Sequence, residues 1–273
     1  MTTRREACGL MLGLPALAAL GLPMRGDASE GGQAGKTAAV SPQAAAAKQK
    51  AAAGLQIGAH QKLVMIGDSI TDVERARPVG EGRDPALGRG YVATVDALLG
   101  AVYPDAWIRV VNMGISGNTT RDLKARWQTD VLDLKPDWLS IMIGANDVWR
   151  QYDSPKQTEK HVLIDEYEKN LDELITIAKP SLKGLVLFTP YYIEPNRQDA
   201  MRATMDKYGA VVKKLASAHG AILVDTQAAF DEILKVYYAA TINWDRVHPN
   251  ATGAAVIARA FLNAIGFNWN RNL

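Results

Sequence analysis

The stretch that decides the fold runs from Lys62 to Asp72 and reads K-L-V-M-I-G-D-S-I-T-D. Its apolar residues follow one another instead of alternating with polar ones, which is typical of a strand buried on both faces of a parallel sheet. The run breaks at Gly67, and a hydroxyl follows at Ser69. Because open parallel sheets place their chemistry beyond the carboxyl ends of the strands, Ser69 lies where a nucleophile belongs. An ordinary turn, in which Asp68 or Ser69 caps the next helix, explains the tripeptide alone equally well.

The chain beyond this stretch alternates strand and helix patterns. Strands are predicted at 62–66, 107–112, 137–143, 184–189 and 221–225, and helices at 90–99, 120–132, 163–178, 200–218, 226–236 and 250–265. Five strands separated by helix-length segments imply right-handed crossovers with helices on both faces of one sheet. We therefore predict an α/β fold, a three-layer α/β/α sandwich around a five-stranded parallel sheet.

The composition limits the classes to which the protein can belong. With 273 residues, of which 48% are hydrophobic, the chain can bury the core of one domain and carry an N-terminal extension. Its formal net charge of +2 comes from interleaved basic and acidic residues, which argues against a nucleic-acid partner. The single cysteine is Cys8, the four histidines are scattered, and no glycine-rich nucleotide motif follows a strand. We expect no metal site and no cofactor.

The first 28 residues have the pattern of an export signal. Arg4 and Arg5 precede an apolar segment at 7–22, and small residues follow, so that cleavage after Ala28 is predicted. The paired arginines suggest the twin-arginine route, whose pattern they match in part. One alternative is an uncleaved membrane anchor, which the shortness and the Gly and Pro content of the segment disfavour. The other is a lipoprotein, for which Cys8 lies on the wrong side of the apolar segment. We expect an exported protein, periplasmic or secreted, without a stable membrane span in its mature form.

The next segment, residues 29–56, consists mostly of Ala, Gly, Gln, Lys and Ser. Such a composition buries too little apolar surface to offset the entropy lost on ordering. We predict that it is a disordered linker and that residues 57–273 form the folded domain.

Residues suited to acyl transfer follow three of the predicted strands. Ser69 follows the first, and the second runs into G-I-S-G-N-T, where Gly114 and Gly117 let the backbone turn sharply and present amide hydrogens. Asn146, in G-A-N-D, places a carboxamide after the third strand. Each glycine could instead be a plain turn residue, and Asn146 could cap the following segment.

A fourth segment, W-D-R-V-H-P, begins at Trp244 and supplies an acid and an imidazole. Asp245 lies three residues before His248, so its carboxylate can accept a hydrogen bond from Nδ1 and leave Nε2 as a base. A lone histidine is more often structural, but His248 is the only one of the four with a nearby acid partner in a loop at the expected edge. An acyl-transfer site needs a nucleophile, a base, an orienting acid and oxyanion donors. All four roles are filled at this edge.

Together, G-D-S-I-T, G-I-S-G-N-T, G-A-N-D and D-R-V-H-P resemble, in order, the four sequence blocks of the SGNH or GDSL-type hydrolases. The resemblance implies a flavodoxin-like sandwich with Ser69 as nucleophile, His248 as base and Asp245 as orienting acid. It also implies three oxyanion donors, namely the backbone N–H groups of Ser69 and Gly117 and the side chain of Asn146. Gly114 remains the alternative to Gly117. The turn is not the G-x-S-x-G elbow, which argues against an α/β-hydrolase fold.

Longer stretches, among them K-P-D-W-L-S-I-M-I-G-A-N-D-V-W-R-Q-Y-D, resemble a bacterial acetylxylan esterase subgroup over Gln61 to Asn270. The resemblance implies a serine esterase that removes acetyl groups from acetylated xylan or xylo-oligosaccharides, and a homo-oligomer. A thioesterase or lysophospholipase, an O-acetyltransferase and a non-catalytic carbohydrate-binding protein on the same fold are the alternatives.

Several aromatic residues lie near the predicted site, namely Trp149, Tyr152, Tyr191, Tyr192 and Trp244. Core packing is the simpler role for each of them. Trp149, Tyr191, Tyr192 and Trp244 are the candidates for contact with a sugar.

Overall fold

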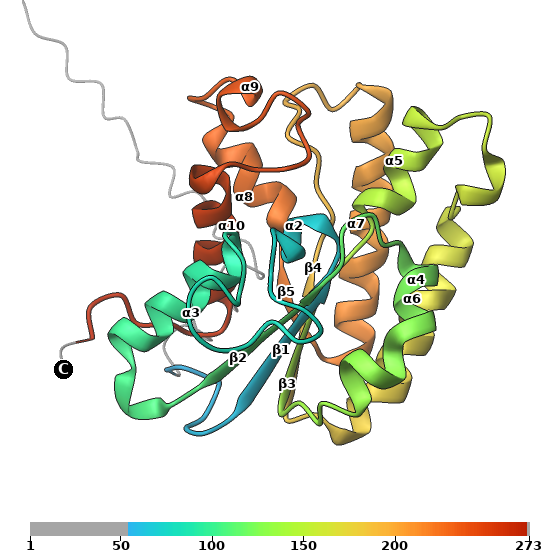
Figure 1. Cartoon of the computed structure of the whole chain (residues 1–273). Coiled ribbons are helices and arrows are strands. Elements are labelled where there is room, and N and C mark those ends of the chain that lie inside the picture. The colour runs from blue at the N-terminus through green and yellow to red at the C-terminus, as the bar shows by residue number, and fades with distance from the viewer. Residues whose placement is uncertain (1–53, 272–273) are drawn as a thin grey trace, which may run out of the picture. The chain divides into compact units, whose positions relative to one another are not determined.

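The computed structural model describes residues 54–271, in which a parallel sheet is covered by helices on both faces (Figure 1). The strands are β1 (Lys62–Gly67), β2 (Arg109–Gly114), β3 (Trp138–Met142), β4 (Gly184–Phe188) and β5 (Ile222–Val224). They lie in the order β2-β1-β3-β4-β5, and all neighbours are parallel. This confirms the predicted sandwich, and the order is that of flavodoxin-like folds. The chain adds β2 on one side of β1 and adds β3, β4 and β5 on the other side, so the strand order reverses between β1 and β3. A ligand crevice is therefore expected between the loops that follow these two strands.

Helices cover the sheet in two groups (Figure 1). One face carries α3 (Tyr91–Val102), α8 (Thr226–Ile233) and α10 (Ala251–Ala264), and the other carries α4 (Thr120–Trp127), α5 (Ala145–Asp153), α6 (Ile164–Ala178) and α7 (Ala200–His219). Two short helices, α2 (Ser69–Asp72) and α9 (Ala239–Ile242), lie at the carboxyl edge of the sheet. Within the described residues, no helix is both long and apolar enough to cross a bilayer.

The central strand, β1, is buried on both faces, as its sequence predicts. Residues 63–66 have no exposed surface, because β1 has strands on both sides and helices on both faces. The second strand starts later than predicted, at Arg109. Trp107 adopts a left-handed conformation with φ 48°, ends a short turn and is 72% exposed, so it cannot continue the ladder.

Contacts with the domain are present before residue 57, where the sequence predicts that the domain begins. The Gln56 N–H donates to the Ile265 carbonyl at 2.9 Å, so the last residues of the predicted linker belong to the fold. The rest of that linker and the predicted export signal, residues 1–28, lie outside the described residues.

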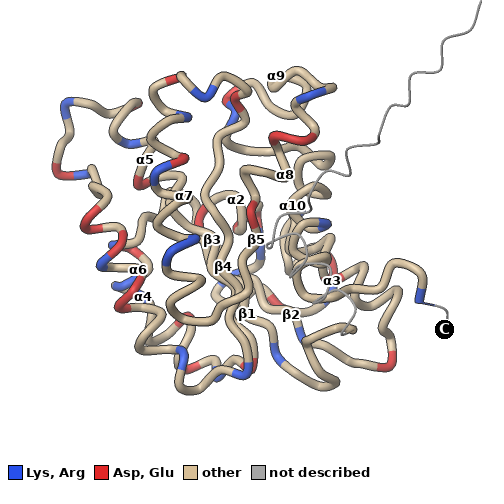
Figure 2. The backbone as a smooth tube through the Cα atoms, turned by 180° about the vertical axis from the view of Figure 1, so that it is seen from behind, with Lys and Arg blue, Asp and Glu red and all other residues tan. Residues whose placement is uncertain are grey.

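Charged residues of both signs alternate over the surface (Figure 2). Two of the ion pairs join α4 to α6, namely Arg121 with Glu166 and Lys124 with Glu173. This interleaving agrees with the mixed pattern of basic and acidic residues along the sequence.

Candidate active site

Ser69 is the first residue of α2 and follows β1 after a single residue. The cap of this helix is Asp68, whose carboxylate accepts the Ile70 N–H at 3.0 Å. The Ser69 hydroxyl is therefore not needed as a cap and faces another partner. Asp68 is fully enclosed, and this burial raises the pKa of its carboxyl to about 6.

The Ser69 hydroxyl meets His248, which is 179 residues away in the chain. Ser69 Oγ lies 2.7 Å from His248 Nε2, and His248 Nδ1 lies 2.7 Å from Asp245 Oδ2. Because an ionised carboxylate only accepts, the Nδ1 proton is placed toward Asp245, and Nε2 is left to accept the hydroxyl proton. The structure thus brings the three predicted residues together as a serine, histidine and aspartate triad.

The carboxylate of Asp245 is fixed by more than the histidine ring. Its Oδ1 accepts the backbone N–H groups of Val247 at 2.9 Å and His248 at 3.0 Å. Burial alone would raise the pKa of Asp245, but the hydrogen bonds from the His248 ring and from the two N–H groups outweigh it and hold that pKa below its usual value. The acid is therefore ionised at neutral pH, as an orienting group must be.

A cavity of about 440 Å³ opens beside the triad. It is lined by the predicted oxyanion donors Ser69, Gly117 and Asn146, and also by Ile70, Val73, Glu74, Ser116, Trp149, Arg150, His248 and Pro249. The Asn146 Nδ2 donates one hydrogen to the Asn118 carbonyl at 3.0 Å, and the second hydrogen of that amide remains for a ligand. Gly117 adopts φ 83°, which turns the loop at the cavity wall.

The structure distinguishes the two glycines that the sequence left open. The Gly114 N–H is occupied, because it donates to Asn112 Oδ1 at 2.8 Å, and its carbonyl accepts from Arg75 at 2.8 Å. Gly114 does not line the cavity, whereas Gly117 does. The geometry therefore favours Gly117 as the donor.

Comparison with known proteins agrees with this geometry. Residues 65–256 match the model of the GDSL-like Lipase/Acylhydrolase family. The chain belongs to this family. The acetylxylan esterase of Geobacillus stearothermophilus is 61% identical over 218 residues, which are 80% of this chain and 100% of that protein.

Two solved structures extend the comparison to the fold. The crystal structure of Axe2, an acetylxylan esterase from Geobacillus stearothermophilus, has a TM-score of 0.79 and covers 80% of this chain and 100% of its own, at 61% identity. LAE5, an alpha/beta hydrolase enzyme from the metagenome of Lake Arreo, has a TM-score of 0.77 at 54% identity and covers 79% of this chain and 100% of its own. The alignments therefore take in nearly all of the described residues.

Catalytic mutants of Axe2 give a further point of comparison. In three solved structures a serine, a histidine or an aspartate of that enzyme is replaced by alanine. There, the serine and the histidine are 179 positions apart, and the aspartate precedes the histidine by three. These are the separations of Ser69, Asp245 and His248.

In this member of the GDSL-like family, the loop from Asp245 to His248 is supported by hydrogen bonds from the segment that follows β4. The Tyr191 hydroxyl donates to the Val247 carbonyl at 2.9 Å, and the Ile193 N–H donates to the Arg246 carbonyl at 2.8 Å. Tyr191 has no exposed surface and packs on Phe230, with 4.4 Å between the ring centroids. It supports the histidine loop and cannot contact a sugar, contrary to the prediction.

Of the other four aromatic residues near the predicted site, one lines the cavity and three do not. Trp149 lines the cavity, and its ring centroid lies 5.7 Å from that of His248. Tyr192 lies outside the cavity, where its backbone binds the Gln227 side chain. Trp244 is 84% exposed and also lies outside the lining. Tyr152 donates to the Ala200 carbonyl on α7.

Two buried acids support the site and were not predicted from the sequence. Asp72 Oδ2 accepts the N–H and the hydroxyl of Ser116, both at 2.9 Å, and so joins α2 to the loop after β2. Burial alone would raise the pKa of Asp72, but hydrogen bonds from Arg77 and Ser116 outweigh it and lower that pKa. Asp147 joins α5 to α4 in a similar way, through Thr120. Asp72 ends α2 and Asp147 lies in the first turn of α5, and the sequence does not indicate which segment each of them binds.

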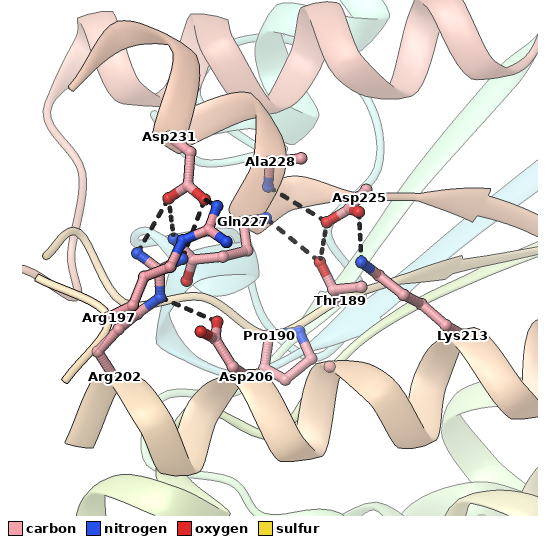
Figure 3. Close-up of a pocket in the computed structure, with 11 residues that line it drawn as sticks. Thr189, Pro190, Arg197, Arg202, Asp206, Lys213, Asp225, Gln227, Ala228 and Asp231 are labelled. Carbon is pink, nitrogen blue, oxygen red and sulfur yellow. Dashed lines mark hydrogen bonds and ion pairs between the residues drawn. The ribbon is translucent and has the colours of Figure 1, made fainter. Parts of the chain in front are cut away.

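A second cavity, of about 310 Å³, lies at the ends of β4 and β5 (Figure 3). Its charged side chains pair with one another: Arg202 with Asp206 and Asp231, each at 2.9 Å, and Lys213 with Asp225 at 2.6 Å. The lining therefore carries little unpaired charge. Residues 54–271 contain no group of three His, Cys, Asp or Glu side chains arranged to hold a metal ion.

Proposed function

We propose that this protein is a serine esterase that removes acetyl groups from acetylated xylan or xylo-oligosaccharides, with Ser69, His248 and Asp245 as its catalytic residues. The observation that carries the proposal is the unbroken chain of contacts from Ser69 Oγ to His248 to Asp245, beside a cavity that Ser69, Gly117 and Asn146 line. The acetylated substrate is supported by the relative of 61% identity, which is named an acetylxylan esterase.

The geometry supports hydrolysis through two acyl transfers. His248 Nε2 takes the Ser69 proton as Oγ attacks the acetyl carbonyl, and the carbonyl oxygen gains a negative charge. The N–H groups of Ser69 and Gly117 and the Asn146 amide stabilise this oxyanion. The carbon–oxygen bond to the sugar then breaks, and His248 returns its proton to the departing sugar oxygen. Water, deprotonated by His248, attacks the acetyl-serine in the same way and releases acetate.

Release of acetate from acetylated xylan, compared with other acetylated glycans, tests the substrate and the nucleophile together. The protein is expected to release acetate fastest from xylan or its oligosaccharides. Ser69→Ala should abolish release while its circular dichroism spectrum stays that of the parent protein, because the hydroxyl is the only group removed. An active Ser69→Ala protein, or a folded parent protein without activity on any acetylated glycan, would disprove the proposal.

The length of the acyl group separates the acetyl esterase from a thioesterase or lysophospholipase. Hydrolysis of p-nitrophenyl esters should be fastest for acetate and fall with each added pair of carbons. A maximum at eight carbons or more would favour the lipid-directed alternative. Acetylated product formed with a sugar in place of water as acceptor would reveal acetyltransferase activity.

Two properties of the whole protein are further proposals. We infer export, with cleavage after Ala28, from the sequence of the first residues; fractionation of cells and sequencing of the mature N-terminus test this. We also propose a homo-oligomer, because the family resemblance implies one and large apolar side chains such as Trp244 and Tyr238 are 84% and 86% exposed. Light scattering after gel filtration gives the mass that decides this.

A further inference from the structure

Arg150 contacts the side chain of the oxyanion donor Asn146. The two residues lie on α5 four positions apart, on the same face of the helix. The Arg150 guanidinium donates to Asn146 Oδ1 at 2.9 Å, and Asn146 Nδ2 donates to the Asn118 carbonyl at 3.0 Å. The amide oxygen therefore has a cationic donor, and the amide nitrogen has an acceptor.

This pair of contacts determines which way the amide faces. If the amide of Asn146 were reversed, its NH₂ group would face the Arg150 donors, and its oxygen would face the Asn118 carbonyl and the cavity. Donor would oppose donor and acceptor would oppose acceptor, and the partial negative charge of the amide oxygen would repel a developing oxyanion. Only the observed orientation gives Asn146, which lines the cavity, an N–H to spare for a ligand there.

We propose that Arg150 is a positioning residue of the oxyanion hole, which keeps the Asn146 amide in the one orientation that stabilises the transition state. The inference rests on the proposed esterase function and identifies a group that the four sequence blocks do not assign. A hydrogen bond from a charged guanidinium is stronger than one from a neutral donor. It also draws electron density toward the amide oxygen, which makes the N–H on the other side of the amide a better donor.

The Arg150 side chain is itself held in place. It forms an ion pair with Asp153 one turn along α5, and its guanidinium carbon lies 5.2 Å from the centre of the Trp149 ring. The side chain is 27% exposed. Because Asp153 and Trp149 already restrain the Arg150 guanidinium, it loses little conformational entropy when it binds Asn146. The contact with Asn146 is therefore formed before substrate binds.

A direct contact with substrate is the rival role for Arg150. Its side chain lines the cavity of the triad and also an adjoining hollow of about 450 Å³, which shares Gly117 with that cavity. A residue that binds the sugar chain affects mainly KM, whereas a residue that orients an oxyanion donor affects mainly kcat. The two roles therefore differ in a measurable way.

Steady-state kinetics on p-nitrophenyl acetate and on an acetylated xylo-oligosaccharide test the inference. Arg150→Met should lower kcat by about tenfold to a hundredfold on both substrates, with KM changed by less than about twofold. Arg150→Lys keeps one cationic donor and should recover part of the loss. Arg197→Met is the matched control, since Arg197 forms an exposed ion pair with Asp231 and lies outside both hollows. It should retain the parent kcat.

A double-mutant cycle with Asn146→Ala shows whether Arg150 acts through Asn146. In the Asn146→Ala background, Arg150→Met should change kcat by less than about twofold, because the amide that it orients is gone. The inference is overturned if the two losses multiply, or if Arg150→Met raises KM and leaves kcat unchanged. A thermal melt of each variant identifies any loss of activity that is due to unfolding. If Arg150→Met unfolds, the kcat of Arg150→Lys relative to the parent protein decides the question.

The same measurements keep this inference separate from the proposed function. If the parent protein releases no acetate, or if Ser69→Ala remains active, the esterase assignment fails. If the parent is active, Ser69→Ala is inactive and Arg150→Met retains the parent kcat, only the role of Arg150 is disproved.

Discussion

Gly114 ends β2 and Gly117 lies three positions later, in the loop that follows, but the two glycines are required for different reasons. A Cβ on Gly114 would overlap the backbone of α2, with the Thr71 carbonyl carbon at 2.6 Å, so this glycine is needed for close packing. A Cβ on Gly117 would meet nothing within 4 Å, but φ 83° is costly for any residue that has a Cβ. The first glycine is fixed by its neighbours, and the second by its own backbone.

This difference predicts that alanine at the two positions lowers the free energy of unfolding by different amounts. Gly114→Ala should lower the free energy of unfolding by about 3 kcal/mol or more, because one of two backbone segments must move. Gly117→Ala should cost about 1–2 kcal/mol and reduce kcat, because relaxation of φ turns its N–H away from the cavity. Gly100→Ala is the control: this glycine lies within α3 with open space around its Cβ position, so alanine should stabilise by about 0.5–1 kcal/mol. Urea denaturation measures all three, and equal costs at Gly114 and Gly117 would contradict the distinction.

At the scale of single residues, sequence identifies groups that do chemistry better than groups that hold them. The proposed roles of Ser69, Asn146 and His248 could be predicted because acyl transfer needs such side chains together at the carboxyl edge of the sheet. Arg150 could not, because arginine is a common surface residue and its partner is known only once α5 has formed. Tyr191 was misplaced because an aromatic side chain next to a strand end can point inward as readily as outward.

At the scale of elements, Asp147 ties α5, which carries the cavity-lining Asn146, to α4. Its Oδ1 accepts the Thr120 N–H at 3.0 Å and the Thr120 hydroxyl at 2.6 Å, which joins the start of α5 to the start of α4. Within residues 54–271, the other carboxyl oxygen has no hydrogen-bond partner. Burial raises the pKa of this carboxyl to about 7, from an ordinary value of 3.8.

The raised pKa of Asp147 predicts how stability varies with pH. Between about pH 4 and pH 7 the folded protein keeps a proton that the unfolded chain has released, so the free energy of unfolding falls as pH rises through this range. Asp147→Asn cannot ionise and still offers Thr120 an acceptor oxygen. Its melting temperature should therefore fall less between pH 5 and pH 8 than that of the parent protein. Asp68, whose pKa is also raised, is present in both proteins, and its charge contributes to the raised pKa of Asp147. Parallel melting curves for the two proteins over this pH range would refute the role of Asp147.

The elements themselves could be predicted where they are long and patterned. The sequence predicts all five strands near their observed positions, and also the helices α3, α4, α6, α7, α8 and α10. Aliphatic runs and helical periodicity can be recognised in the sequence without knowledge of the fold. The helices α2, α5 and α9 were not predicted. Helices α2 and α9 contain only four residues each. Helix α5 contains nine residues, more than α4 or α8 with eight each, but it begins in a turn-forming sequence and looks like a loop until the sheet places it.

At the scale of the whole molecule, the segment just before β1 closes the fold at the end of α10. The side chain of Gln56 donates to the Ala264 carbonyl at 3.3 Å, in addition to the backbone bond to Ile265. Ile57 is 1% exposed, and the His60 N–H donates to the Ala106 carbonyl at 2.7 Å. These contacts join distant parts of the chain, which is why the low-complexity composition that precedes them did not reveal where the fold begins.

Two truncations test where the domain begins. A chain that starts at Gly54 keeps these contacts and every residue of the proposed site, so it should retain the kcat and melting temperature of the full-length protein. A chain that starts at Gln61 loses the burial of Ile57, worth about 2 kcal/mol, and should melt roughly 4–8 °C lower. At 25 °C its kcat should stay within about twofold of the parent, because the triad lies at the opposite, carboxyl edge of the sheet. Equal melting temperatures for the two truncations would show that residues 54–60 do not stabilise the domain. A chain from Gly54 that has lost activity would place part of the functional protein before that residue.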